Sequence, residues 1–260
     1  MAAAMSDSDL DAVAERLAAD IADGDHFPVW LSGSLDLDGA LAVQLRLLRR
    51  DLDEGEQLAG WKVGLTSERA RRAVGADVRP FGYLLASHVF ASGAEIPASS
   101  IRRPSIEVEF LFTITRPLRG AAVTSAEARA ASDHVAAGFE LNERRAGSVR
   151  PDLVAMATDR MTQWGVVEGT GVDPRGVNLN DVVVRMWCDD DERIAARSGD
   201  EVDDHWTSIA RLAAELDHYD LGLQPGQKVI TGALGRFDLV PGEQWRASFD
   251  GIGDVAIRST

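Results

Sequence analysis

The stretch Ile106-Glu107-Val108-Glu109-Phe110-Leu111-Phe112 begins with alternating apolar and acidic side chains, a pattern typical of a β-strand. Side chains at positions i and i+2 of a strand share a face, so Glu107 and Glu109 point to the same side. Two carboxylates held this close repel each other unless a cation or a shared proton lies between them. The same alternation is typical of a half-exposed antiparallel strand whose acids face water. The spacing alone therefore leaves two interpretations, a cation site and a solvated face.

A third acid, Glu140, lies in the short apolar context Phe139-Glu140-Leu141, which we place just after a helix predicted near residues 125–137. An unpaired charge in apolar surroundings is costly. Three converging carboxylates offer the oxygen ligands that a hard divalent ion such as Mg²⁺ accepts. The hypothesis is therefore a metal site formed by Glu107, Glu109 and Glu140.

The segment Gly60-Trp61-Lys62-Val63-Gly64-Leu65-Thr66 places one lysine inside an apolar strand bracketed by glycines. Burial without a partner lowers the pKa of a lysine and favours general acid–base catalysis. Alternatively, Lys62 extends to a carboxylate at the surface. If the glutamates hold a metal, Lys62 is the cation that meets an anionic substrate there, and we expect it to matter for turnover more than for folding.

Two glycine-containing motifs differ in what they predict. Thr231-Gly232-Ala233-Leu234-Gly235 is a turn of small residues after a short strand, and such turns let backbone N–H groups approach a ligand carboxylate. No Gly-Lys-Ser/Thr follows, so this turn is not a phosphate loop. Gly251-Ile252-Gly253 lies too close to the end of the chain for the helix that a dinucleotide-binding fingerprint requires.

The composition excludes two classes of partner. The chain has 260 residues, 45% of them apolar, with 27 Lys and Arg against 42 Asp and Glu and a net charge of -15. Such a surface repels nucleic-acid phosphates and anionic membranes, and a site for a small anionic substrate must supply its own positive charge. The single cysteine, Cys188, and the lack of a signal peptide or a long apolar run predict a cytoplasmic protein.

The chain divides into a helical part, residues 1–58, and a strand-rich part, residues 59–260. Amphipathic helices are predicted at 7–23 and 38–51, and later helices near 125–137 and 206–217. Short strands separated by Gly and Pro favour a mixed, sheet-dominated α+β body over repeated βαβ units. The predicted strands are 61–65, 106–115, 139–142, 164–168, 181–188, 228–231, 244–249 and 254–258.

Taken jointly, these motifs resemble the 2-keto-4-pentenoate hydratase and 4-oxalocrotonate decarboxylase branch of the fumarylacetoacetate hydrolase superfamily, over roughly residues 30–260. The segments that carry the resemblance are Gly60-Trp61-Lys62-Val63-Gly64-Leu65-Thr66, Phe81-Gly82, Pro104-Ser105-Ile106-Glu107-Val108-Glu109, Phe139-Glu140, Thr231-Gly232-Ala233-Leu234-Gly235 and Gly251-Ile252-Gly253.

The resemblance implies a fold and a metal site. The fold is a mixed β-sheet roll like the C-terminal domain of that superfamily, formed by residues 59–260, with the helical part in front of it. Mg²⁺ or Mn²⁺ is held by Glu107, Glu109 and Glu140, Lys62 lies beside the metal, and the subunits form homo-oligomers. The substrates are small 2-oxo or 2-hydroxydienoic acids from the breakdown of aromatic compounds.

The expected activity is that of a lyase, a hydratase that adds water through a metal-stabilised enolate. The alternatives are a 4-oxalocrotonate-type decarboxylase, a C–C hydrolase of the same superfamily, and an inactive metal-binding assembly subunit. Retention of the three acids and the lysine argues against the inactive subunit. Lys62 is the catalytic candidate, and the candidates for substrate binding are Leu65, Arg160, Trp164, Thr231, Gly232 and Ala233.

The chain departs from the family pattern around the expected pocket. Arg160 could hold a distal carboxylate bidentately, as a decarboxylase requires, or could pair with Asp159 or Asp152 at the surface. Trp164 and Trp206 would instead offer apolar walls, which suit a hydratase. The departures are Pro80 where an acid is expected, Asp159-Arg160 for Asp-Asn, Trp164 for a small residue, and Asp204-His205-Trp206 for Gly-His-Pro.

Overall fold

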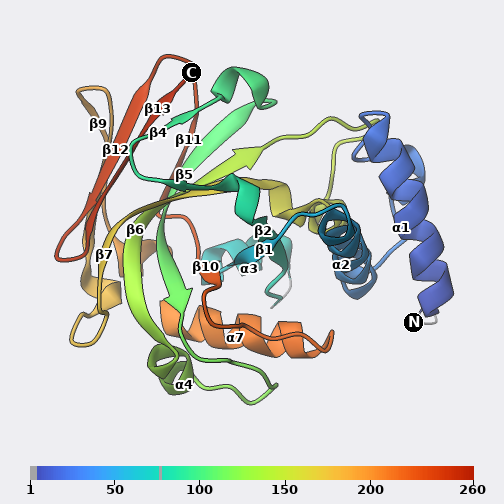
Figure 1. Cartoon of the computed structure of the whole chain (residues 1–260), viewed down its shortest axis with the longest axis horizontal. Coiled ribbons are helices and arrows are strands. Elements are labelled where there is room, and N and C mark those ends of the chain that lie inside the picture. The colour runs from blue at the N-terminus through green and yellow to red at the C-terminus, as the bar shows by residue number, and fades with distance from the viewer. Residues whose placement is uncertain (1–4, 76–77) are drawn as a thin grey trace.

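The computed structural model describes residues 5–75 and 78–260. Its centre is a strongly curved sheet, with a second sheet on one side and helices around the other sides (Figure 1). The helices of the described part are α1 (Asp7–Ala22), α2 (Leu37–Asp53), α3 (Glu68–Val74), α4 (Ser125–Ala130), α5 (Leu153–Thr158), α6 (Ser198–Glu201) and α7 (His205–Asp217). The strands are β1 (Leu58–Val63), β2 (Phe81–Leu85), β3 (Val89–Ala91), β4 (Ala94–Ile96), β5 (Pro104–Ile114), β6 (Ser132–Glu143), β7 (Gln163–Val172), β8 (Val183–Cys188), β9 (Asp191–Arg197), β10 (Lys228–Ile230), β11 (Gly235–Asp238), β12 (Gln244–Phe249) and β13 (Gly253–Ser259).

The curved sheet has eight strands in the order β2-β1-β10-β5-β6-β7-β3, with β11 added by pairing to β5. Its pairs are antiparallel except for β1 with β10 and β3 with β7. Strand β2 contacts β7, so the sheet curls back on itself. The second sheet has the order β4-β13-β12-β8-β9. This mixed and curled architecture confirms the predicted α+β fold with a β-sheet roll.

Strand β5 is buried on both faces along most of its length. Its even-numbered side chains belong to the main hydrophobic core between the two sheets and α7. The other face carries Glu107 and Glu109, which are only 8% and 2% exposed. A half-exposed strand with solvated acids is therefore the wrong interpretation. Farther along this face, a small apolar cluster contains Leu84, Leu111, Val166 and Ile230.

The two N-terminal helices start at side-chain caps that satisfy exposed backbone N–H groups. Ser6 forms a capping box with Asp9 at the start of α1, and Asp36 caps α2. Helix α2 packs on α5 and β2, and its buried Gln44 donates to the carbonyl of Phe81 at 3.0 Å. The division of the chain into residues 1–58 and 59–260 stays a prediction.

The helix predicted near residues 125–137 is wrong beyond Ala130, because α4 ends there and β6 begins at Ser132. The alanine-rich sequence favours a helix, but Val135, Ala137 and Phe139 alternate into the main core. Pairing with β5 along most of β6 outweighs the local helix propensity. Glu140 consequently lies inside a long strand and not just after a helix.

The helices predicted at 7–23, 38–51 and 206–217 and the predicted strands are present, with most ends shifted by a few residues. The strand predicted at 139–142 is the end of the much longer β6. Most of the remaining elements are too short to show a periodicity in the sequence. No helix in the described ranges is long and apolar enough to cross a membrane. The elements that the sequence does not predict are α3, α5, α6, β2, β3, β4, β9 and β11.

Candidate metal centre and active site

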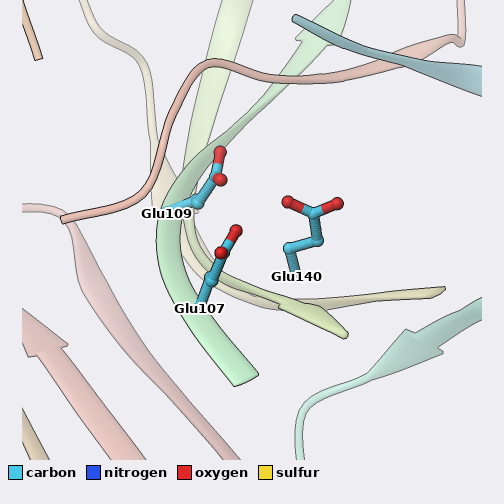
Figure 2. A group of neighbouring side chains, drawn as sticks. All are labelled: Glu107, Glu109 and Glu140. Carbon is cyan, nitrogen blue, oxygen red and sulfur yellow. The ribbon is translucent and has the colours of Figure 1, made fainter. Parts of the chain in front are cut away.

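The three predicted metal ligands converge on one point of the curved sheet. Strand pairing places Glu140 of β6 directly opposite Glu107 of β5, and Glu109 lies two residues farther along β5 on the same face. Each residue offers a carboxylate oxygen, and these oxygens all lie within 4.8 Å of one another. Figure 2 shows the three carboxylates directed into a common space. The structure thus brings together acids that lie more than thirty residues apart in the sequence.

Burial and mutual repulsion perturb two of these acids. Burial, followed by the negative charges of Glu140 and Glu107, raises the pKa of Glu109 well above its usual value. Burial also raises the pKa of Glu140, although Lys62 opposes this shift. The Oε2 atom of Glu140 is buried and has no hydrogen-bond partner among the described residues. The surroundings of the cluster therefore disfavour the fully ionised form of its acids when no cation is bound.

Lys62 of β1 projects to the same point and forms an ion pair with Glu140. Its Nζ atom also lies 3.3 Å from the carbonyl oxygen of Met161. Burial alone would lower the pKa of Lys62, but the charges of Glu140, Glu107 and Glu109 raise it. The interpretation of Lys62 as a surface-reaching lysine is wrong, and so is the expected lowering of its pKa.

The predicted loop at Thr231 approaches the cluster through its backbone. The N–H group of Gly232 donates to Glu109 Oε2 at 2.7 Å. Gly232 has a φ of 123°, and a Cβ there would lie 1.9 Å from the hydroxyl oxygen of Thr66. Only glycine suits this position, because the backbone conformation and the lack of space both exclude a side chain. Ala233 follows in the same loop and is partly buried.

Leu65 follows β1 and is partly buried. It has a left-handed backbone with a φ of 55°, and its carbonyl oxygen accepts a hydrogen bond from Arg71 Nη1 at 3.0 Å. The structure thus places Leu65 three residues beyond Lys62, at the end of the strand that carries the lysine. It shows no polar role for the Leu65 side chain.

The segment Arg160-Met161-Thr162 forms a left-handed turn, with φ values of 54°, 53° and 66°. Each non-glycine residue in this conformation costs roughly 1–2 kcal/mol. The turn brings the Met161 carbonyl to Lys62, and the backbone of Arg160 lies against Gly82, which pairs with Lys62. The strain is therefore located where backbone atoms form part of the site.

The side chains of two predicted substrate-binding residues, Arg160 and Trp164, pack against aromatic rings and not against the three glutamates. The guanidinium of Arg160 is 5.0 Å from the ring centre of Tyr83 and lines a cavity of about 260 Å³ beside α1 and α2. Among the described residues Arg160 forms no ion pair with Asp159 or Asp152, so the expected surface pairing is wrong. Asp159 pairs with the buried Arg145 at 3.0 Å, and Asp152 caps α5. Trp164 stacks on His88 at 4.3 Å between ring centres. Arg160 contributes its backbone to the site, and Trp164 belongs to an aromatic stack.

Two residues near the cluster were not assigned a role from the sequence. Arg236 of β11 pairs in register with Glu107, and its Nη1 atom lies 3.3 Å from Glu107 Oε1. His205, at the start of α7, is fully buried, with Nδ1 2.7 Å from the Thr231 hydroxyl oxygen. The Asp204-His205 pair before a helix is a sequence signal for His205, whereas β11 is too short to reveal Arg236.

His205 leads to a prediction about stability and pH. Burial lowers the pKa of His205 from 6.5 to about 4, so the folded protein takes up this proton less readily than the unfolded chain. Neutral His205 makes its full contribution to the free energy of unfolding above pH 6.5. As the pH falls from 6.5 towards 4, this free energy decreases by up to about 3 kcal/mol. We expect His205→Gln to remove this part of the pH dependence.

Urea unfolding of the metal-free protein at several pH values measures this effect. His218→Gln is the matched control, because His218 is exposed just beyond the other end of α7. Between pH 7 and pH 4, the free energy of unfolding of the control variant should change with pH as steeply as that of the wild type. An unchanged slope in the His205 variant would contradict the assignment of His205 as a neutral buried group.

The donor set is suited to a hard divalent cation. It consists only of carboxylate oxygens, the ligands that Mg²⁺, Mn²⁺ and Ca²⁺ prefer. Three acids face two cations, Lys62 and Arg236, and one Glu140 oxygen has no hydrogen-bond partner among the described residues. A divalent ion would remove the repulsion that raises the carboxylate pKa values.

Comparisons with known proteins give consistent matches. A 2-oxo-hept-4-ene-1,7-dioate hydratase from Escherichia coli is 26% identical over 234 residues, which cover 86% of this chain and 87% of that protein. A 2-keto-4-pentenoate hydratase from Paraburkholderia xenovorans is 27% identical over 234 residues, covering 89% and 85% respectively. The solved structure of 4-oxalocrotonate decarboxylase from Pseudomonas putida G7, complexed with magnesium and adipate, matches with a TM-score of 0.89 and 21% identity over 99% of both chains. No protein-family model matches the chain.

Proposed function

Because this chain belongs with the 2-keto-4-pentenoate hydratases and 4-oxalocrotonate decarboxylases of the fumarylacetoacetate hydrolase superfamily, we propose that it is a metal-dependent lyase of the hydratase type. It would add water to a small 2-hydroxydienoic or 2-oxo acid. The observation that carries this proposal is the buried cluster of Glu107, Glu109 and Glu140 with Lys62 in contact. A structural subunit without catalysis would have no use for such an unstable group of buried charges.

Glu107, Glu109 and Glu140 would hold Mg²⁺ or Mn²⁺ in this proposal. The ion supplies a Lewis acid that withdraws charge from the oxygens of a 2-oxo acid. The chain itself fixes the ligands. Pairing between β5 and β6 sets the separation of Glu107 and Glu140, and the Gly232 N–H group orients Glu109.

Lys62 would act as the acid of the site. In the metal-free site the charges of the three glutamates raise the pKa of Lys62 and favour its protonated form. An ammonium group has three N–H bonds, and two of them are directed to Glu140 and to the Met161 carbonyl. The third is available to a substrate, where it can hold an oxygen or deliver a proton to carbon.

Hydration is favoured over decarboxylation by the position of Arg160. A decarboxylase of a diacid must hold a second carboxylate, and Arg160 was the candidate for that task. Its guanidinium lies over Tyr83 in the cavity beside the N-terminal helices and is already in contact with an aromatic face. This arrangement supports a substrate whose far end does not require Arg160.

We also propose that the protein is a cytoplasmic homo-oligomer. The family resemblance supports the assembly, and the free, buried thiol of Cys188 is compatible with a reducing compartment. Burial raises the pKa of Cys188 to about 11, which makes the thiol a poor nucleophile. Light scattering of the purified protein measures the assembly directly.

Incubating the Mg²⁺-loaded protein with 2-hydroxypenta-2,4-dienoate and, separately, with 4-oxalocrotonate tests the activity. We expect loss of the dienoate absorbance without release of CO₂. Release of CO₂ from the diacid alone would favour the decarboxylase. Inactivity on both compounds, with metal binding intact, would favour the assembly subunit or a more specialised substrate.

A further inference from the structure

Arg236 is the exposed cation of the candidate site. Strand β11 pairs with β5 so that Arg236 lies opposite Glu107. Its Nη1 atom is 3.3 Å from Glu107 Oε1, and its Nη2 atom donates to the buried hydroxyl oxygen of Ser105 at 2.9 Å. The side chain is 43% exposed, whereas that of Glu107 is 11% exposed. One edge of the guanidinium is thus held in place while the group as a whole remains accessible to solvent.

A site for an anionic ligand in this acidic protein needs a local positive charge. A net charge of -15 repels small anions from most of the surface. Lys62 is buried and already paired with Glu140. Among the described residues, Arg236 is the other basic side chain with a recorded ion pair to one of the three glutamates. Arg236 is thus the more exposed of the two cations that contact the cluster.

We propose that Arg236 is a substrate-binding residue that receives the C1 carboxylate of the 2-oxo acid. The proposal rests on the function proposed above. Without metal, Arg236 balances the charge of Glu107. A divalent ion bound to Glu107 would weaken the ion pair between Glu107 and Arg236. The guanidinium would then be available to an anionic ligand at the same site. The planar fork of arginine then matches the two oxygens of a carboxylate.

This role predicts effects of opposite sign on two equilibria. Arg236→Gln removes a positive charge that opposes a cation at Glu107, so we expect Mn²⁺ to bind with equal or up to about tenfold higher affinity. The same substitution removes a charged donor for the ligand, so oxalate should bind to the Mn²⁺-loaded variant about ten- to hundredfold more weakly. A residue that only supports the local structure would weaken both equilibria.

Isothermal titration calorimetry of the full-length protein measures both affinities. Arg144→Gln is the matched control, because Arg144 is 50% exposed and pairs at 3.0 Å with Asp238 on the same strand β11. It should leave both equilibria unchanged. Arg236→Lys keeps the charge but not the fork, and should recover part of the oxalate affinity. Raising the salt concentration should reduce the difference in oxalate affinity between the wild type and Arg236→Gln.

Three outcomes overturn the proposal. If Arg236→Gln weakens Mn²⁺ and oxalate binding together, Arg236 is a structural support. If it changes neither, Arg236 is a surface residue. If the Mn²⁺-loaded wild type does not bind oxalate at all, the function proposed above fails and this inference fails with it. The second outcome holds whenever the variant binds oxalate as tightly as the wild type, and it contradicts the role of Arg236 alone.

Discussion

Replacing Glu109 with glutamine is expected to abolish metal binding and, in the same variant, to stabilise the metal-free protein. Glutamine has the same shape and can still accept the hydrogen bond from Gly232, so the packing is preserved. It removes one of three mutually repelling buried charges, whose repulsion contributes to the raised pKa of Glu109. We expect Mn²⁺ affinity to fall at least about a hundredfold, and the metal-free protein to gain roughly 1 kcal/mol or more.

Thermal unfolding with chelator and with excess Mn²⁺ measures both effects. The wild type should melt at a higher temperature with Mn²⁺, whereas Glu109→Gln should melt at one temperature under both conditions, above that of the metal-free wild type. Glu168→Gln is the control, since Glu168 is a glutamate of the same sheet that pairs with Lys228. The control should retain its response to Mn²⁺. A Glu109 variant that still responds to Mn²⁺ would remove this residue from the metal site.

Replacing Lys62 with methionine is expected to lower kcat by about a hundredfold to ten-thousandfold, the usual contribution of a positioned proton donor. The sequence alone suggested little effect on folding, but the ion pair with Glu140 changes that expectation. Removing one partner of a buried pair leaves the other uncompensated, at a cost of about 3–5 kcal/mol. We expect this loss in the metal-free protein and a large recovery when Mn²⁺ neutralises the glutamates.

The chain's other lysine provides the control. Lys228 forms an ion pair with Glu168 at 2.6 Å on the same curved sheet, but it takes no part in the glutamate cluster. Lys228→Met should therefore lose stability that Mn²⁺ does not restore, and should keep its kcat. Full activity of Lys62→Met, measured on the dienoate with Mg²⁺ present, would show that another group delivers the proton.

The sequence predicted those parts of the site that depend on local pattern. The period of two in β5 placed Glu107 and Glu109 on one face, and the short apolar run around Lys62, bounded by glycines, predicted a strand. The position of Glu140 was harder to predict from the sequence. The sequence predicted a strand at 139–142, but the helix predicted before it hid the length of β6, and only the long pairing with β5 places Glu140 opposite Glu107.

Other parts of the site depend on tertiary structure that leaves no local signal. Arg236 reaches Glu107 because the four-residue strand β11 adds to the edge of β5, and no periodicity can be read from so few residues. The pKa of Lys62 depends on partners from distant strands, which reverse the effect of burial. The left-handed turn at Arg160–Thr162 contains no glycine, so its backbone conformation could not be expected from composition.

The left-handed turn at Arg160–Thr162 lies between the candidate site and the cavity beside α1 and α2. Its backbone carbonyl at Met161 faces Lys62, while the neighbouring side chain of Arg160 extends into the cavity beneath α1 and α2. A single peptide unit thus separates Lys62 from the contacts of the N-terminal helices. We therefore expect a substitution at Tyr83 of β2 or at His26, both of which line this cavity, to reach the wall of the site through this turn and not through a residue of the glutamate cluster.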